Sequence, residues 1–332
     1  MSVAAALERA RTRRPIARAI EGQEAALLAV VVVLWIALSL GTDTFLTSGN
    51  LRNIVYSVAP IAIVGIGMTA VIVTAGIDVS VGSAVAVVMV VVAKLVRDQG
   101  MPWLPAVLVA LVLGGALGVV NGLLVAYGRV HPIIITFATL NVYRFVALQI
   151  FQSKQVDGVP GTLSWFGGGA GGSTIGVPNA WWLAMLIAAA VWVYMRYWAS
   201  GRHWYAIGGD QVAARLAGVR VARRQVAAYT LTGVLVGLAA CVLIGSGGLV
   251  QQNSGIGMEL EVIAAVVIGG TSILGGRGTV LGTLLGALLV GTIESAITLL
   301  GWRTELSDLA VGVFILVAVG VDLLRQRRRR RA

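Results

Sequence analysis

The residue that most invites a chemical role is Asp78, which stands inside a long apolar stretch in the segment GIDVSVGS at 76–83. A carboxylate among apolar residues is costly to bury, so it usually faces a cavity, a polar solute or a partner. One interpretation therefore places Asp78 beside a polar solute or a gate. The other, which the order Asp-x-Ser before an apolar run favours, has Asp78 and Ser80 capping the helix predicted at 80–97. The two roles can coexist.

A second segment, YAIGGDQVAARLAGV at 205–219, has the composition of a short polar helix. Asp210 is a suitable N-cap, Ala213 and Ala214 are strong helix formers, and Gly218 is a typical stop. The pattern predicts a helix of about two to three turns. Two interpretations stay open: the small alanine face docks in the groove of a partner, or the segment is a surface linker.

A third polar segment, GMELEVIAA at 257–265, leads into the glycine cluster GGTSILGGRG at 269–278. Glu259 and Glu261 lie two residues apart and do not share a helix face, which argues against an acid–base pair. No Gly-Lys-Ser/Thr follows the glycines, so an ATP-binding P-loop is absent from the sequence. One cysteine and two histidines leave little room for a metal site. We therefore expect no catalytic residue, metal or cofactor in this chain.

The composition decides the class of protein. The chain has 332 residues, of which 58% are hydrophobic and only 12% are charged, whereas a soluble domain carries about 25% charged residues. A water-facing surface of this size needs more polar groups than the chain supplies. The sequence therefore predicts an all-α membrane protein that crosses the bilayer many times, and the soluble classes are excluded.

The net charge of +11 is concentrated at the two ends of the sequence. Residues 1–18 contain five arginines and one glutamate, and residues 325–332 contain six arginines and no acid. A basic balance can indicate nucleic-acid binding, but arginines flanking membrane spans are better explained by topology and by contact with anionic lipid. We therefore expect membrane lipid, and no nucleic acid, as a partner.

Apolar runs long enough to cross a bilayer, which takes about 20 residues, divide the sequence into a basic tail at 1–23, a membrane domain at 24–324 and a basic tail at 325–332. The run 259–274 is short, and 54–97 is nearly continuous around a break at Gly76, so one or two runs are candidates for broken or re-entrant segments. Ten spans are predicted: 24–41, 54–75, 80–97, 104–127, 131–151, 179–199, 225–246, 259–274, 279–300 and 307–324.

The positive-inside rule orients these spans. With both tails in the cytoplasm, most of the 25 lysines and arginines fall on the inner side, including those of the loop 200–224. The longest outer loop is 152–178, which is rich in glycine. The remaining cations fall outside or near outer helix ends: Arg52, Lys94, Arg97, Arg144, Lys154 and Arg303.

Glycines inside the predicted spans recur every fourth residue, at Gly114, Gly118 and Gly122 and again at Gly233 and Gly237. Small residues at this spacing let helix backbones approach closely in lipid. We expect close packing within one subunit rather than a seam between two copies.

The three polar segments, in this order, resemble those of the ribose-type permease family, the membrane subunits of bacterial ABC importers for monosaccharides. The stretch ELEVIAAVVIGGTSILGGRGTVLGTLLGALLVG at 259–291 and the sequence VHPII at 130–134 after Asn121 add to the resemblance, which runs from about residue 50 to 322. His131 and Asp210 depart from the family pattern, the latter where Asn is usual.

The resemblance implies a vitamin B12-type (type II) importer fold in the inner membrane, with about ten spans in each of two permease chains, identical or paired. It also implies a periplasmic sugar-binding protein and a cytoplasmic ATPase that binds the ATP. The helix at 209–218 then resembles the coupling helix that docks on the ATPase. Its residues are Gly209, Asp210, Ala213, Ala214 and Gly218. Polar residues at helix breaks or inside spans are the candidates for the pathway: Asp78, Ser80, Asn121, Thr136 and Asn141.

The substrate is less well defined by the resemblance. The wording NSGIGMELEVIAA at 253–265 and IESAITLL at 293–300 leans towards permeases for autoinducer-2 or rhamnose, while ribose, xylose and other small polyols remain open. The alternative function is an ion-coupled secondary transporter that works without an ATPase. That function needs buried acids to load a proton or Na⁺, and the candidates are Asp78, Glu261 and Glu294.

Overall fold

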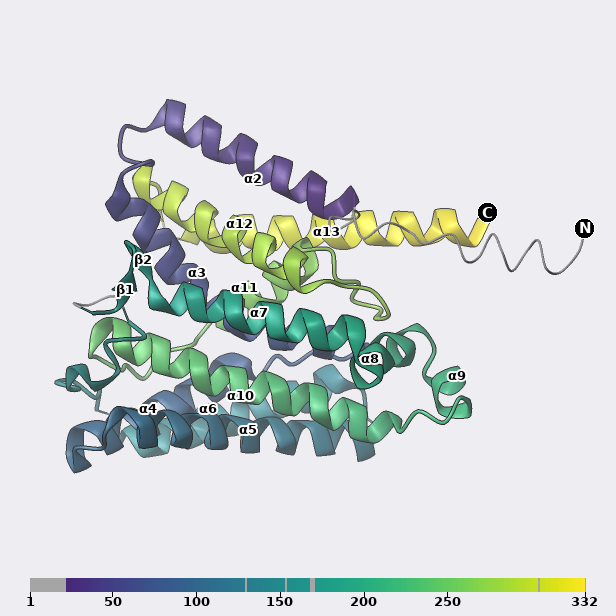
Figure 1. Cartoon of the computed structure of the whole chain (residues 1–332), viewed down its shortest axis with the longest axis horizontal. Coiled ribbons are helices and arrows are strands. Elements are labelled where there is room, and N and C mark those ends of the chain that lie inside the picture. The colour runs from purple at the N-terminus through teal and green to yellow at the C-terminus, as the bar shows by residue number, and fades with distance from the viewer. Residues whose placement is uncertain (1–21, 129, 153, 168–170, 304, 332) are drawn as a thin grey trace, which may run out of the picture.

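The computed structural model describes residues 22–331, except for 129, 153, 168–170 and 304. Most of these residues form helices that run along one common direction (Figure 1). A 3₁₀ turn at Gly161–Leu163 and an antiparallel pair of two-residue strands, β1 (Ser173–Thr174) and β2 (Val177–Pro178), interrupt the helical pattern. The α-helices are α2 Gly22–Gly41, α3 Ser48–Val73, α4 Val81–Gln99, α5 Trp103–Tyr127, α6 Pro132–Phe151, α7 Asn179–Tyr197, α8 Ala199–Gly209, α9 Gln211–Leu216, α10 Val221–Gly247, α11 Met258–Ile268, α12 Val280–Leu299 and α13 Glu305–Arg331.

The two ends of the bundle are distinct (Figure 1). One carries the short helices α8 and α9 and is called the α9 end below. The other carries the β1–β2 pair and is called the hairpin end. The long helices from α2 to α10 alternate in direction between these ends, and α12 runs the same way as α10 because only the short α11 lies between them.

Each of the ten predicted spans overlaps one helix, but not every helix could cross a bilayer alone. Within the described part of the chain, seven are long and apolar enough: α2, α3, α5, α6, α7, α10 and α12. Helix α4 carries Lys94, Arg97 and Asp98 near its end, and α11 has only 11 residues, against the roughly 20 that a full crossing needs. The short α11 matches the prediction that the run 259–274 is incomplete.

Helices α3 and α10 form the centre of the bundle. In α3, every residue from Val58 to Val73 is buried, which suits a helix that is apolar on all sides. In the most apolar stretch of 18 residues, 83% of the residues are buried in α3, but only 22% are buried in α2 and in α6. The outer helices therefore present apolar side chains outwards, as a protein surrounded by lipid requires.

The glycine repeats allow α5 and α10 to pack closely against each other. A methyl group added at Gly114 would lie 2.3 Å from the Gly233 carbonyl oxygen, and one at Gly118 would lie 2.4 Å from the Tyr229 carbonyl oxygen. The two backbones are therefore in direct contact. This agrees with the prediction that the glycines serve packing within one chain.

Two interruptions in the helices meet inside the bundle. As predicted around Gly76, α3 stops at Val73, and residues 74–80 lead to the start of α4. Residues 248–257, between α10 and α11, return from the hairpin end and bring Gly255 against Gly82. A methyl group added at Gly82 would lie 2.2 Å from the Gly255 carbonyl oxygen. Gly82 lies roughly 25 Å along α4 from its far end at Gln99, so the returning segment reaches deep into the bundle.

Candidate functional site

A buried polar cluster joins the first interruption to α5. The amide Nδ2 of Asn121 donates to Ser80 Oγ at 2.7 Å and to the Asp78 carboxylate at 3.2 and 3.3 Å. The Ser80 backbone N–H and hydroxyl both donate to Asp78 Oδ1, at 3.0 and 2.7 Å. All three side chains are at most 3% exposed. The structure thus brings together three of the five residues proposed for a pathway, and we call them the central cluster.

The capping interpretation of this segment is only partly right. Ser80 is the N-cap residue of α4, but its side chain accepts no hydrogen bond from the free N–H groups of the helix. Its backbone has φ −84° and ψ −6°, whereas a capping residue is usually extended so that its hydroxyl faces those groups. Asp78 and Ser80 instead bond each other and Asn121, so they hold the broken segment to a neighbouring helix.

Tyr143 and Thr136 of α6 support the central cluster from a third side. Tyr143 Oη lies 3.2 Å from Asn121 Oδ1 and 3.0 Å from the Leu117 carbonyl oxygen. Thr136 Oγ1 lies 3.0 Å from the Ile77 carbonyl oxygen and accepts from the Val79 N–H at 3.3 Å. These contacts fix the backbone on both sides of Asp78.

Asn141, the fifth candidate, lies elsewhere. It is exposed on α6, and its amide donates to the Phe137 carbonyl oxygen of its own helix at 2.9 Å. Asn141 therefore has no contact with the central cluster.

The central cluster borders a very small cavity. Its volume is about 10 Å³, and its walls include Asp78, Asn121, Tyr143 and Thr232. One water needs roughly that much room. A monosaccharide therefore does not fit beside Asp78 in this conformation, and the cluster forms part of a closed region.

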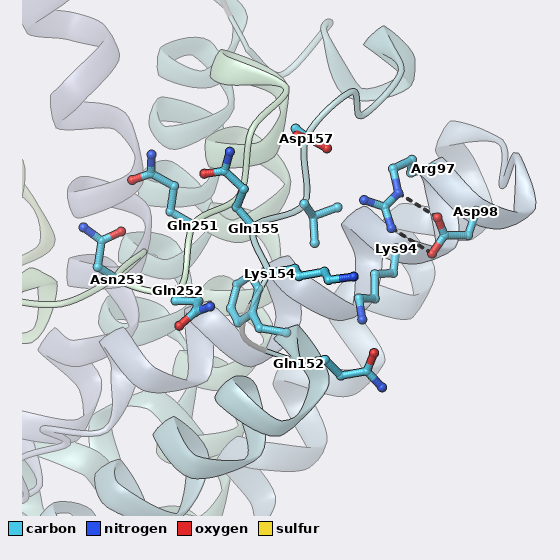
Figure 2. Close-up of a pocket in the computed structure, with 12 residues that line it drawn as sticks. Lys94, Arg97, Asp98, Gln152, Lys154, Gln155, Asp157, Gln251, Gln252 and Asn253 are labelled. Carbon is cyan, nitrogen blue, oxygen red and sulfur yellow. Dashed lines mark hydrogen bonds and ion pairs between the residues drawn. The ribbon is translucent and has the colours of Figure 1, made fainter.

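A much larger polar cavity, of about 940 Å³, opens at the hairpin end (Figure 2). Amide and charged side chains dominate its walls, and we call it the amide cavity. It is lined by Lys94, Arg97, Asp98, Phe151, Gln152, Lys154, Gln155, Val156, Asp157, Gln251, Gln252 and Asn253. Amides both donate and accept hydrogen bonds, so this lining suits a neutral solute with several hydroxyl groups.

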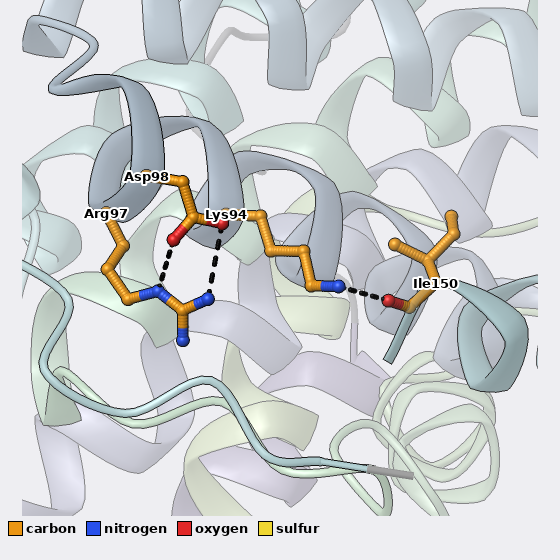
Figure 3. Close-up of polar contacts among 4 residues, drawn as sticks. All are labelled: Lys94, Arg97, Asp98 and Ile150. Atoms are coloured by element: carbon orange, nitrogen blue, oxygen red, sulfur yellow. Dashed lines mark hydrogen bonds and ion pairs between the residues drawn. The ribbon is translucent and has the colours of Figure 1, made fainter. Parts of the chain in front are cut away.

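Three charged residues of the amide cavity, Lys94, Arg97 and Asp98, are held by polar contacts at the end of α4 (Figure 3). Arg97 makes a two-pronged contact with Asp98, with Nε to Oδ1 at 2.6 Å and Nη2 to Oδ2 at 3.2 Å. Lys94 Nζ donates to the Ile150 carbonyl oxygen at the end of α6. Lys154 points towards the helix that carries Lys94 (Figure 2). Three cations against two carboxylates, Asp98 and Asp157, leave little net charge at the cavity.

The returning segment connects the amide cavity to the interior. Its residues Gln251, Gln252 and Asn253 line the cavity, and two residues later Gly255 meets Gly82. Arg144 of α6 fixes this course, because its Nη1 donates to the Ser254 carbonyl oxygen at 3.0 Å and lies 3.4 Å from that of Gln252. The contact between Gly82 and Gly255 therefore stands between the amide cavity and the central cluster.

The amides of this cavity were not among the predicted site residues. The signal that could have found them is the run Gln251-Gln252-Asn253 directly after a long apolar helix. The positive-inside rule predicted Lys94, Arg97 and Lys154 outside or near outer helix ends. It could not assign them to a common site, because their convergence depends on how α4 packs beside the end of α6.

At the α9 end, the predicted short helix is present but covers only the six residues of α9. As predicted, Asp210 is its N-cap and accepts from the Val212 and Ala213 N–H groups at 2.8 and 3.0 Å. Gly218 follows the helix with φ 82°, a conformation that favours glycine. The helix is shorter than the predicted two to three turns because the chain turns away after Leu216.

The exposed face of α9 differs from the predicted alanine face. Ala214 is only 5% exposed and packs against Ile207 and Val221 of its own chain. Val212 and Leu216 are instead 69% and 85% exposed. Of the other predicted coupling residues, Gly209, Asp210, Ala213 and Gly218 are all exposed.

Comparisons with known proteins cover most of the chain. Residues 50–319 match the family described as branched-chain amino acid transport system / permease component. The chain is 37% identical to a ribose import permease of Escherichia coli over 92% of this chain and 94% of that one. It is 33% identical to a D-allose transport system permease of the same species, over 90% of each chain. It is 34% identical to a fructose import permease of Rhizobium meliloti, over 84% of this chain and 79% of that one. No solved structure matches it at a significant level.

Proposed function

The chain belongs to the branched-chain amino acid transport system / permease component family, and on that premise we propose that it is the membrane subunit of an ABC importer for a neutral monosaccharide. The observation that carries this proposal is its similarity, over most of its length, to import permeases named for ribose, D-allose and fructose. The protein is then a multi-pass protein of the inner membrane and a transport subunit rather than an enzyme.

The amide cavity supports a neutral, hydroxyl-rich substrate. Its glutamines and asparagine offer donors and acceptors in one place, and its volume of about 940 Å³ exceeds what a single sugar ring needs. We propose that it is the outward entrance to the pathway and that the Gly82–Gly255 contact and the central cluster form the closed region beneath it. That the substrate is rhamnose or autoinducer-2, as the segments 253–265 and 293–300 suggest, stays a prediction.

The proposed orientation places the α9 end in the cytoplasm and the hairpin end outside. Its support is the cluster of arginines in α8, α9 and the start of α10, as the positive-inside rule requires. In the same proposal the chain makes about ten crossings in a vitamin B12-type fold and pairs with a second permease chain. A periplasmic binding protein delivers the sugar at the hairpin end.

We propose that α9 couples the chain to a separate ATPase. The supporting observation is that the apolar side chains of Val212 and Leu216 are exposed on the surface at the α9 end. Such side chains suit insertion into a partner's groove. Replacing Leu216 by Glu should weaken co-purification with the ATPase by at least about tenfold, the loss typical of a buried interface anchor. Ile175→Glu is the matched control, because Ile175 is 91% exposed at the hairpin end. Equal binding by both variants would contradict the coupling role.

A second function, ion-coupled transport without an ATPase, has one observation in its favour. Glu261 and Glu294 line a cavity of about 600 Å³ together with Tyr56 and Asn53, so two acids face one space within the membrane domain. Such acids can load a proton or Na⁺. We rank ion-coupled transport second because this chain is similar to sugar import permeases over most of its length and of theirs.

One transport experiment separates the two functions. The chain is reconstituted in vesicles, alone or with its ATPase and binding protein, and uptake of labelled ribose, allose, fructose and rhamnose is measured. We expect uptake only with all components and hydrolysable ATP. Uptake by the chain alone, driven by a proton gradient, would overturn the ABC importer proposal and establish the second function.

A further inference from the structure

A basic cavity of about 890 Å³ lies at the α9 end, between the start of α2, the end of α7 and the loop before α12. We call it the arginine cavity. Among the residues that the structure describes, three arginines line it, Arg196, Arg202 and Arg277, against one carboxylate, Glu24. Its other lining residues are Gly22, Gln23, Trp192, Met195, Tyr205, Gly269, Gly270, Gly276, Gly278, Thr279 and Val280. Neither the transport pathway proposed above nor the coupling helix uses these residues.

The Glu24 carboxylate in the wall of the arginine cavity is already engaged. Glu24 is 4% exposed, and its Oε1 accepts a hydrogen bond from the Thr279 hydroxyl. Arg196 and Arg202 are exposed. Arg202 donates through Nη1 to the Tyr197 carbonyl oxygen at 2.6 Å, which uses one of the five N–H donors of its guanidinium. Among the described lining residues the three arginines outnumber Glu24, so this lining carries an excess of positive charge. Its guanidinium groups have the shape that binds phosphate oxygens in pairs.

Aromatic side chains of the kind that gather at a membrane interface lie beside the arginine cavity. The Arg196 guanidinium lies 5.5 Å from the centre of the Trp192 ring and 5.9 Å from that of Tyr197. Trp and Tyr gather where lipid headgroups meet the hydrocarbon, and a cation over an aromatic face is stabilised there. Trp192 is itself 41% exposed, so this wall of the cavity faces outwards from the bundle.

The helices on either side of the cavity offer apolar surface to acyl chains. On α2, Val33 is 65% exposed and Ile36 is 55% exposed, and on α7, Leu186 is 67% exposed. These side chains lie roughly 15 Å along the two helices from the cavity, where the acyl chains of a lipid bound there would run. A free phosphate would make no use of that surface, whereas a phospholipid would.

We propose that the arginine cavity binds the phosphate headgroup of an anionic phospholipid from the leaflet at the α9 end. Basic pockets between membrane helices are suited to such headgroups. The lipid would tie α2 to α7, two helices at the periphery of the bundle. The proposal needs only that the chain lies in a membrane, so it stands whichever solute is transported and whatever drives that transport.

The test measures lipid retained by the purified full-length protein in detergent, by native mass spectrometry. Phosphatidylglycerol, phosphatidylcholine and inorganic phosphate are added separately and in competition. We expect phosphatidylglycerol to bind about tenfold more tightly than phosphatidylcholine, because the charge-assisted bonds are lost with a neutral headgroup. Inorganic phosphate at the same concentration should not displace it. Equal binding of both lipids, or displacement by phosphate, would overturn the lipid assignment.

Variants locate the site. Arg196→Gln with Arg202→Gln should weaken phosphatidylglycerol binding by about tenfold or more. Arg215→Gln with Arg220→Gln removes the same charge from exposed positions at the same end and should change binding less than twofold. Equal loss in both variants would refute a specific site. If the first variant does not fold, the salt dependence of lipid binding to the wild type is the test. Added salt should weaken the binding of phosphatidylglycerol and leave the binding of phosphatidylcholine unchanged. Phosphatidylglycerol binding that does not respond to salt would refute the proposal.

Discussion

The central cluster and the amide cavity are both polar regions in a protein that is 58% hydrophobic, yet they are built in opposite ways. In the central cluster the side chains of Asp78, Ser80 and Asn121 bond one another and are almost fully buried. In the amide cavity, Gln251 and Asn253 stand exposed along a cavity of about 940 Å³. Polar groups that satisfy each other hold the backbone, and polar groups that face open space are available to a solute.

If the central cluster holds the backbone, the largest loss of stability is expected on substitution of Asn121. Replacing Asn121 by Ala leaves the buried Asp78 and Ser80 without their shared donor, which should lower the free energy of unfolding by about 2–3 kcal/mol. Chemical unfolding in detergent micelles measures this. Asn141→Ala is the matched control, because Asn141 is exposed and bonds only its own helix, so a change within about 0.5 kcal/mol is expected. Similar losses in the two variants would break the comparison.

A smaller effect is expected at the contact that separates the two regions. A methyl group at Gly82 would lie 2.2 Å from both the Gly255 carbonyl oxygen and Glu259 Oε2, so Gly82→Ala must push the returning segment away. We expect a loss of about 1–3 kcal/mol in stability and a rise in solute leak across vesicles. Gly49→Ala is the control, since nothing lies within 4 Å of the added methyl. A Gly82→Ala protein with unchanged stability and no leak would argue against a seal at this contact.

The smallest effect should appear in the amide cavity and only in transport. Gln251→Ala combined with Gln252→Ala removes two amides that face the cavity, and each lost hydrogen bond to a sugar costs about 1 kcal/mol. The KM for uptake should rise roughly tenfold or more, while the free energy of unfolding stays unchanged. Initial rates over a range of sugar concentrations give the KM, with Asn141→Ala again as the control. A loss of stability without a change in KM would assign these amides to packing.

The sequence was sufficient for features that depend on neighbouring residues. The interruption near Gly76 was predictable because glycine weakens a helix and Asp78 and Ser80 favour helix starts. The cap at Asp210 and the stop at Gly218 were predictable for the same local reasons, and both are present.

Features that depend on distant parts of the chain were not predictable. Asn121 and Asn141 looked alike as polar residues inside apolar spans, and only packing decides that one faces Asp78 and the other faces outwards. Ala214 suited a docking face by composition, but the turn into α10 buries it against Val221. The amide cavity needs α4, the end of α6 and the returning segment to converge, and no local pattern encodes that.

The contact between Gly82 and Gly255 can form only after both residues have been synthesised, so it forms late in biogenesis. Ribosomes add about 5–20 residues per second, so Gly255 emerges roughly 10 to 35 s after Gly82 at those rates. During that interval the start of α4 has no returning segment against it. The helices made before residue 248 therefore wait in the membrane with the start of α4 uncovered, and residues 248–257 cover it when they are synthesised, ahead of α11, α12 and α13.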